Sequence, residues 1–338
     1  MSVTLKQLAD EAGVSQATIS LALNGSNLVA QKTRSRILSI AKRMKYEPNM
    51  VARSLAGCKT KLLGILLDSG APQAQFRMCG LIEREAALHG YRTMIGEGHN
   101  SIDELYQNYS VFKQYRAAGV ICVSHEYHGD EDKLNHLFGD CNDIVYIGKP
   151  RLPHASYLAI DRSMAIRQAV SHLRENGFSK IGLMGTMDRY DSEREKADVF
   201  CDALKEAGVD NPEQYLISIA FEDPVQGMEE IYEKFVKTER IDALLAGNDT
   251  QAAILSKILR RNNLKVPDDF GLVGFDDEPF CEYMNPSISS IDDELQLQAK
   301  LIVRLMMEMI EDEVSNPIDR TVTVRSRLVV RESSCKKA

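Results

Sequence analysis

From residue 61 onward, short apolar segments alternate with amphipathic ones, and this alternation is the feature that most constrains the fold. Strands are predicted at 62–67, 92–95, 119–123, 143–147, 157–160, 180–184, 215–218, 242–245 and 270–273. Helices are predicted between them, for example at 76–89, 102–116, 162–175, 192–207, 225–237 and 249–261. Apolar strands that alternate with helices are typical of parallel sheets covered on both faces. The number of predicted strands is larger than one ordinary open sheet holds. We therefore expect an α/β core of two similar subdomains.

The first 46 residues have a different pattern, which predicts helices only. Thr4 can cap a first helix, Gly13 interrupts it, and Ser15 can cap a second helix. A third helix is expected over residues 31–45. Its inward-facing apolar side chains are expected to be Ile37, Leu38, Ile40, Ala41 and Met44.

The net charge of −8 is unevenly distributed along the chain. Residues 1–60 hold nine Lys/Arg and three Asp/Glu, a net charge of +6, whereas the other 278 residues hold 32 and 46, a net charge of −14. A basic segment attached to an acidic body indicates a module that binds a polyanion. The overall negative charge therefore does not exclude nucleic acid as a partner.

The sequence also predicts the compartment. No apolar stretch reaches the ~18 residues that a membrane-spanning helix needs, and residues 1–6 lack the apolar core of a signal peptide. The seven cysteines are scattered, without a Cys-x-x-Cys pair, which agrees with a reducing compartment. We expect a cytoplasmic protein.

Residues 8–20 have the pattern of a helix–turn–helix motif. Ala9 is small where the second helix crosses, Gly13 can adopt the positive φ of a tight turn, and Ile19 fills the angle between the helices. The second helix would present base-reading side chains to a major groove, namely Ser15, Gln16, Ala17 and Ser20. Phosphate contacts are expected from Thr4, Asn24, Thr33 and Arg34. The alternative is an ordinary three-helix cap, and the charge of this segment favours DNA binding.

These residues resemble a known family. The segment Thr4–Gly25 is similar to the head of lactose-repressor/galactose-repressor (LacI/GalR) family transcription factors. The likeness continues through residues 29–37 and 46–55, then through Gly247-Asn248-Asp249, 266–269, Val273-Gly274-Phe275-Asp276-Asp277, 286–291 and 327–333. These landmarks span almost the whole chain in the order and spacing of the family.

The resemblance implies a domain organisation. A helix-turn-helix DNA-binding head over 1–46 would be followed by a hinge over 47–60 and by an effector-binding and dimerisation core over 61–338. That core would resemble periplasmic sugar-binding proteins, with two Rossmann-like subdomains joined by three crossings, near 160–163, 289–293 and 318–322. The first subdomain would comprise about 61–160 and 292–318, and the second about 161–290 and 319–332.

The hinge contains a segment, Asn49 to Ala56, that is too short to form a stable isolated helix in water. In the family, paired hinge helices enter the minor groove, and one leucine unstacks the central base step. The matching residue is Leu55, while Asn49 and Arg53 would lie along the DNA backbone. The alternative is a plain linker with an incidental leucine.

Leu21 departs from the family pattern. Many members have arginine at this position of the recognition helix, where it can read a guanine. Leucine cannot make that bidentate bond, so it either contacts a thymine methyl group or packs within the head. The operator sequence therefore cannot be transferred from other members, and Gln16 and Ala17 would set it together with Leu21.

A ligand site is expected at the carboxyl ends of the strands, where open α/β sheets bind their ligands. Asp68, Asn248 and Asp276 each follow a predicted strand. The resemblance makes Asp276 the carboxylate that accepts sugar hydroxyls, with Asn248 as a polar partner, and Phe221 matches an aromatic that stacks on the ligand. Phe221 could instead pack in the core, and Asp68 could instead cap a helix.

Lys196 occupies the expected position of the ligand-binding arginine of the family. Lysine keeps the positive charge but lacks the planar fork of a guanidinium. A carboxylate or phosphate on the ligand stays open, and the neighbouring Arg194 is an alternative.

Two other patterns are rejected. The segment Ser124-His125-Glu126-Tyr127-His128 does not have zinc-protease spacing and is expected to be a loop. Gly96-Glu97-Gly98 lacks the third glycine of a dinucleotide fingerprint, and no nucleophile–base pair stands out. We expect no metal, no cofactor and no enzyme activity.

The sequence thus predicts a ligand-responsive transcriptional repressor that binds a palindromic operator as a homodimer. A small molecule, a sugar, would switch it by binding between the core subdomains. The alternative is a corepressor-type regulator that responds to a nucleobase, a nucleoside or a phosphorylated metabolite.

Overall fold

The computed structural model describes residues 3–23, 26–46, 60–67, 73–99, 101–123, 131–185, 191–218, 223–311 and 320–336. The chain divides into two compact units, Met1–Thr60 and Lys61–Ala338. Residues 47–59, which form nearly all of the predicted hinge, lie outside the described residues. Within the described ranges, no helix combines the length and the apolar character needed to cross a membrane.

The first unit contains three helices, α1 (Leu5–Ala12), α2 (Gln16–Leu23) and α3 (Gln31–Arg43). Gly13 ends α1 with a φ of 62°, the left-handed conformation that the tight turn requires. The helices pack around a small core made of Leu8, Ala9, Ala12, Ile19, Ala22, Val29, Ile37 and Ala41. The expectation for Leu38 was wrong, because its side chain is 47% exposed. One helical step of about 100° from Ile37 carries Leu38 off the face that Ile37 and Ala41 share.

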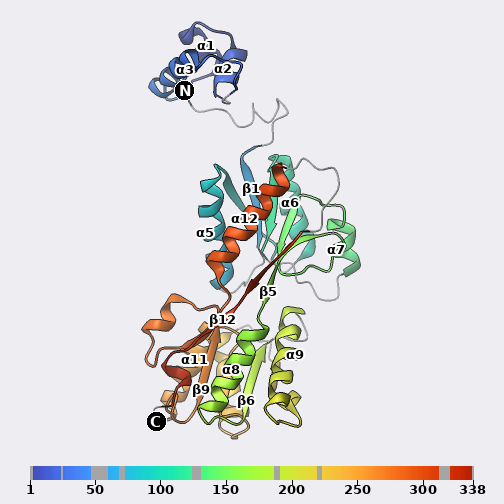
Figure 1. Ribbon diagram of the computed structural model, residues 1–338, viewed down its shortest axis with the longest axis vertical. Coiled ribbons are helices and arrows are strands. Elements are labelled where there is room, and N and C mark those ends of the chain that lie inside the picture. Colours follow the sequence, from blue (N-terminus) through green and yellow to red (C-terminus); the bar gives the residue numbers. More distant parts are fainter. Residues whose placement is uncertain are drawn as a thin grey trace. The chain divides into compact units, whose positions relative to one another are not determined.

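The second unit begins with a parallel six-stranded sheet in the order β11-β5-β4-β3-β1-β2 (Figure 1). Its strands are β1 (Leu62–Leu67), β2 (Arg92–Glu97), β3 (Gly119–Cys122), β4 (Ile144–Ile147), β5 (Ser156–Asp161) and β11 (Thr321–Arg325). Helices α5 (Gln73–Leu88) and α12 (Leu295–Glu311) pack on one face. Helices α6 (Ile102–Gln114) and α7 (Glu131–Phe138) pack on the other. We call this layered body the first subdomain.

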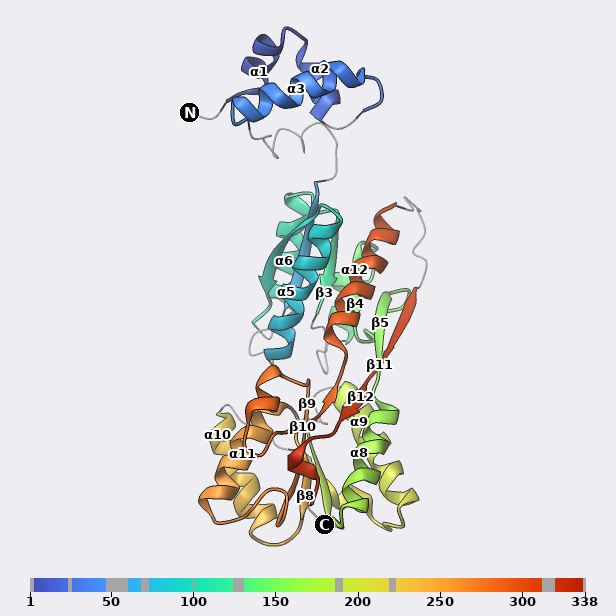
Figure 2. The ribbon, with the colours of Figure 1, turned by 60° about the vertical axis from the view of Figure 1, so that its left-hand side comes forward.

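The second subdomain has another six-stranded sheet, in the order β12-β10-β9-β8-β6-β7, in which only β12 is antiparallel to its neighbour. Its strands are β6 (Ile181–Gly185), β7 (Leu216–Ser218), β8 (Ala243–Leu245), β9 (Gly271–Phe275), β10 (Ser289–Asp292) and β12 (Arg327–Val329). As Figure 2 shows, α8 (Ser163–Glu175) and α9 (Asp191–Glu206) cover one face, and α10 (Pro224–Ile231) and α11 (Asp249–Arg261) cover the other. Short helical segments complete it: η1 (Pro212–Tyr215), η2 (Tyr232–Val236), η3 (Pro279–Tyr283) and η4 (Glu332–Ser334).

Three crossings connect the subdomains, after β5, after β10 and between β11 and β12. One side chain of each crossing belongs to a single hydrogen-bonded cluster. The guanidinium of Arg162 pairs with Asp293 (Nη2–Oδ2, 2.5 Å), and the Ser326 hydroxyl donates to the same carboxylate (2.6 Å). The crossings are therefore bonded to one another where they leave the sheets.

The predicted position of the third crossing, 318–322, was wrong. Residues 321–325 form β11, which pairs in parallel with β5 of the first sheet, and the chain crosses at Ser326. The segment 319–332 therefore does not belong to the second subdomain as a whole. The physical reason is that Thr321–Arg325 extends the first sheet as an edge strand, with Val324 buried against its core.

Candidate functional site

Helix α2 carries an exposed face of mixed polar and apolar side chains. Positions 16, 17, 20 and 21 lie on one side of a helix at about 100° per residue. The predicted base-reading side chains are all exposed, namely Ser15, Gln16, Ala17, Ser20 and Leu21, whereas Ile19 and Ala22 are buried in the core of the first unit. The structure thus brings the predicted α2 residues together on one accessible surface.

Two of the predicted DNA contacts also stabilise helix ends. The Thr4 hydroxyl accepts the Gln7 N–H (3.3 Å), and the Gln7 side chain accepts the Thr4 N–H (2.8 Å), which is a capping box for α1. The Ser15 hydroxyl accepts the Thr18 N–H (3.1 Å) at the start of α2. The helix ends are therefore fixed in the free protein.

The remaining predicted phosphate contacts are only partly placed. Thr33 lies in the first turn of α3 and is partly exposed. The guanidinium of Arg34 donates to the Ser26 carbonyl, which gives this arginine a structural bond within the first unit. Four predicted residues lie outside the described residues: Asn24, Asn49, Arg53 and Leu55.

Leu21 lies on the same exposed face of α2. It is 37% exposed and does not belong to the buried core of the unit. An exposed leucine makes no favourable interaction with water, but it can make an apolar contact with a thymine methyl group. Of the two alternatives for Leu21, the structure favours the surface contact over packing.

A second candidate site lies where the two subdomains meet. The chain leaves β5 at its carboxyl end to enter the second subdomain, and it leaves β10 at its carboxyl end to enter the first. Because the neighbouring strands β4 and β9 are parallel to these, their carboxyl ends point toward the same boundary. This is the edge at which α/β sheets bind ligands.

Asp276 follows β9 directly at this edge. Its backbone has a φ of 95°, and its N–H donates to the Ile291 carbonyl at 2.9 Å, which holds the turn against β10. Burial and the nearby charge of Asp293 raise the pKa of Asp276 to about 7, while Lys196 and Arg162 act in the opposite direction. Within the described part of the chain, no group donates a hydrogen bond to this carboxylate. Its acceptor capacity is thus available to a ligand.

Lys196 lies close enough to Asp276 to influence its ionisation, but it is already bound. Its Nζ pairs with Glu193 Oε1 at 2.8 Å and lies 4.5 Å from the centre of the Phe275 ring. The lysine side chain is only 10% exposed and that of Glu193 17%. The positive charge is therefore compensated within the protein.

Asn248 caps α11 with its side-chain oxygen, which accepts the Gln251 N–H at 3.0 Å. The next residue, Asp249, is fully buried and accepts the Glu278 N–H and the Ser290 hydroxyl, each at 2.7 Å. These bonds hold the turn that contains Asp276. Burial raises the pKa of Asp249 to about 6, against the effect of these bonds.

Gly274 shows how tightly Asp249 packs against β9. A Cβ atom at this position would lie 2.0 Å from an Asp249 carboxylate oxygen, so only glycine fits. The sequence contained this signal, because Gly274 and Asp249 both belong to the family motifs. Sequence reasoning nonetheless missed Asp249, as well as Glu193, Arg162 and Asp293, as members of the site.

Several expectations at this site fall on residues that are not described. Asp68 and Phe221 lie outside the described residues, as do residues 124–130 with their two histidines. The predicted residues that the structure brings to the second subdomain's edge are Lys196, Asn248 and Asp276.

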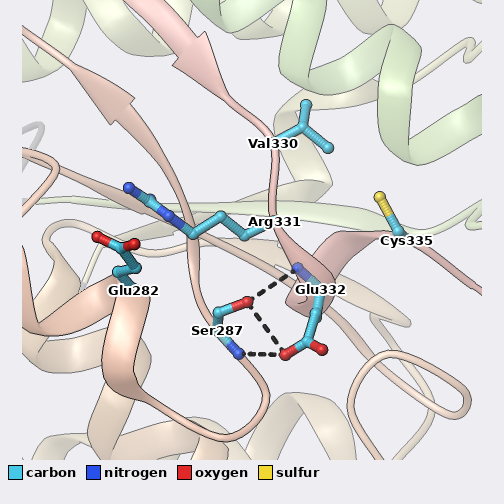
Figure 3. Close-up of a pocket in the computed structure, with 6 residues that line it drawn as sticks. All are labelled: Glu282, Ser287, Val330, Arg331, Glu332 and Cys335. Atoms are coloured by element: carbon cyan, nitrogen blue, oxygen red, sulfur yellow. Dashed lines mark hydrogen bonds between the residues drawn. The ribbon is translucent and has the colours of Figure 1, made fainter.

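A pocket of about 660 Å³ lies elsewhere in the second subdomain, next to η3 and η4 (Figure 3). It is lined by Glu282, Ser287, Val330, Arg331, Glu332 and Cys335. Ser287 donates to Glu332 through its N–H (2.9 Å) and its hydroxyl (3.1 Å), and Arg331 pairs with Asp277 at 2.7 Å. These polar groups bind protein groups already, and none of the predicted ligand residues lines the pocket.

Two family models match the chain, in the order that the fold suggests. Residues 4–49 match the family described as "Bacterial regulatory proteins, lacI family". Residues 170–334 match the "Periplasmic binding protein-like domain".

Curated relatives cover nearly the full length. The chain is 26% identical over 335 residues to the "HTH-type transcriptional repressor PurR" of Mannheimia succiniciproducens, covering 99% of both proteins. It is also 26% identical over 332 residues to the "Ribose operon repressor" of Bacillus subtilis, covering 97% of this chain and 99% of that protein. Both relatives are named as repressors rather than enzymes.

Among solved structures, the chain resembles the lac repressor dimer bound to operator and the anti-inducer ONPF. The TM-score is 0.84 with 19% sequence identity, over 99% of this chain and 100% of that one. This likeness establishes a shared fold. The two family models and the full-length relatives show that the chain belongs to the LacI family of bacterial regulatory proteins.

Proposed function

We propose that this protein is a ligand-responsive transcriptional repressor that binds a palindromic operator through two copies of its first unit. The observation that carries the proposal is the exposed face of α2, with Gln16, Ala17 and Leu21, on a segment of net charge +6. The relatives described above are named as repressors. A bacterial regulator of this kind acts on the chromosome, in the cytoplasm.

We propose that the operator contacts follow the family pattern. Ser15, Gln16, Ala17, Ser20 and Leu21 face the major groove, and Thr4, Asn24 and Thr33 contact phosphates. Leu55 acts in the minor groove as the wedge between base pairs, and Asn49 and Arg53 lie along the DNA backbone. Exposed apolar side chains on α5 and β2, Phe76, Leu88 and Ile95, support a homodimer, since a second copy would cover them.

For the effector we propose an uncharged, polyhydroxylated molecule, a sugar, bound at the boundary between the subdomains. Asp276 supplies acceptors to its hydroxyls, with Asn248 beside it. Lys196 is paired with Glu193, and Arg162 with Asp293, so neither cation is free for a phosphate group. Asp68 and Phe221 complete the proposed site. This charge balance favours a sugar over a phosphorylated metabolite.

Two experiments test these proposals. Selection from random DNA with the purified protein should enrich a palindrome whose affinity falls steeply with salt, as phosphate contacts require. Enrichment of no palindrome would overturn operator binding. A thermal-shift screen of neutral sugars, nucleobases, nucleosides and sugar phosphates should then identify the effector class, and stabilisation by sugar phosphates alone would refute the neutral-sugar proposal.

Replacing Leu21 with arginine should change the base that α2 reads. Arginine can form a bidentate bond with guanine, which leucine cannot, and such a bond is worth about 1–3 kcal/mol of discrimination. The selected base pair should therefore change from A·T to G·C at one position of each half-site. At that position the affinity for G·C relative to A·T should rise roughly tenfold. The measurement is a selection from random DNA repeated with the variant.

The matched control is Leu38→Arg. Leu38 is an exposed leucine on α3, so the same charge is added to the same unit away from the α2 face. This variant should raise affinity for all sequences alike. If Leu21→Arg, like the control, left the selected sequence unchanged, Leu21 would have no role in base reading.

Effector affinity should depend on pH near neutrality. The ionised carboxylate of Asp276 accepts on both oxygens, whereas the protonated carboxyl group donates from one of them, and the pKa of Asp276 is raised to about 7. Affinity should thus be constant well above pH 7 and fall by about tenfold per unit below it, because the protonated fraction grows tenfold per unit. Calorimetric titration between pH 6 and 8.5 measures this. A flat profile that matches the one for Asp276→Asn would argue against a bond from the effector to this carboxylate.

A further inference from the structure

Arg151 connects the two subdomains at their boundary. It lies in the connection between β4 and β5 of the first subdomain, and its guanidinium bonds both carboxylate oxygens of Asp191. Asp191 is the first residue of α9 in the second subdomain. A third nitrogen of Arg151 bonds Glu131, the first residue of α7. One arginine thus joins the start of a helix in each subdomain.

A second ion pair crosses the boundary elsewhere. Arg77 of α5 in the first subdomain pairs with Glu278, which follows β9 in the second subdomain, at 3.0 Å. The Glu278 side chain is 7% exposed. Helices α5 and α7, which carry Arg77 and Glu131, lie on opposite faces of the first sheet (Figure 1).

These two pairs differ from the third ion pair at the boundary. Arg162 and Asp293 both belong to the crossings themselves, and their bond links chain segments that run together between the sheets. Arg77, Arg151 and their partners are carried by the bodies of the subdomains. Because an ion pair needs about 4 Å or less between its charged atoms, a separation of a few ångströms at the boundary would break them.

We propose that Arg151–Asp191 and Arg77–Glu278 are closure contacts, which hold the two subdomains together before any effector binds. A contact that exists only in the closed arrangement shifts the balance between open and closed forms toward the closed form. If the proposed effector binds the closed form, these pairs also raise its apparent affinity without touching it. That consequence rests on the proposed function, whereas the closure itself does not.

Arg151 is the better residue to test. Its side chain is 29% exposed and that of Asp191 37%, so removing either charge leaves no deeply buried ion. Arg77→Gln would instead leave the Glu278 carboxylate buried without its partner. The cost of an unpaired buried charge would then lower the stability of the fold itself. The control is Arg167→Gln, because Arg167 pairs with Glu206 inside the second subdomain at similar exposure of the arginine, 34%.

The experiment is hydrogen–deuterium exchange with mass spectrometry on the full-length, ligand-free protein without DNA. Arg151→Gln should accelerate exchange at the starts of α7 and α9 and in residues 276–283, by up to about fivefold, the range expected for a partly exposed pair. Asp191→Asn should do the same at the start of α7 and in residues 276–283. In residues 276–283 the double variant should be no faster than Arg151→Gln alone, because Arg151→Gln already removes the bond to Asp191.

The salt dependence gives a second measure. High salt should bring the wild-type exchange rates close to those of Arg151→Gln, since partly exposed pairs are screened. Additive effects of the two substitutions, or equal effects of Arg151→Gln and Arg167→Gln, would overturn the proposal. Because neither DNA nor effector is present, failure of operator binding or of effector binding would leave this result unaffected.

Discussion

Replacing Ile19 with asparagine should abolish specific operator binding while the second unit unfolds at an unchanged temperature. Ile19 is fully buried between the helices of the first unit, and asparagine would place an unpaired amide there. Losing the apolar burial and leaving the amide unsatisfied together cost about 3–5 kcal/mol. A unit this small has roughly that much stability in total. We therefore expect operator affinity to fall by at least about 100-fold, since only the folded head binds.

Leu38→Asn is the matched control, because it makes the same chemical change at a side chain that is 47% exposed in the same unit. Its operator affinity should stay within about threefold of wild type, as surface substitutions cost little. Fluorescence anisotropy measures the affinity and calorimetry the unfolding of the second unit. If the two variants bound operator equally well, the first unit would not be the DNA-binding module.

Replacing Asp276 with asparagine should remove the response to the effector. The substitution keeps the shape of the side chain but removes the charge and replaces one acceptor oxygen with a donor. A hydrogen bond to a charged group contributes about 1.5–3 kcal/mol, so losing two hydroxyl partners should weaken effector binding by about 100-fold or more. Operator affinity without effector should stay unchanged. Calorimetry and thermal shift with the effector found by the screen measure the loss.

The control for this substitution is Asp198→Asn, which removes an exposed carboxylate from α9 of the same subdomain. It should bind the effector like the wild type. An unchanged thermal shift in Asp276→Asn would place the effector away from this carboxylate. A lowered melting temperature without effector would instead indicate damage to the turn that Asp249 holds.

Local features of the chain predicted most of the fold. Apolar strands such as 62–67 and 119–122 are recognisable because both faces of a parallel sheet are covered. Gly13 marked a helix boundary because it adopts a left-handed backbone conformation that other residues adopt only at a cost. The third crossing was misplaced because nothing local distinguishes an edge strand of one sheet from a connection to the other.

The side-chain pairings at the proposed ligand site could not be predicted from the sequence. Lys196 was identified as a ligand contact, but its bond with Glu193 and its contact with the Phe275 ring depend on the folded arrangement. Arg162 and Asp293 are 131 residues apart, and Arg151 and Asp191 are 40 apart. Pairings over such distances are set by sheet topology and leave no periodic pattern in a single sequence.

The order of segments in the second unit has a consequence for biosynthesis. Edge strand β11 completes one sheet and β12 the other, and both come from residues 321–329. Neither sheet can therefore be completed on the ribosome until nearly all of the chain has been translated. The first unit, by contrast, is one contiguous stretch at the start of the chain and can fold early. Translation that stops before residue 321 would thus release a DNA-binding segment joined to a core that lacks an edge strand from each sheet.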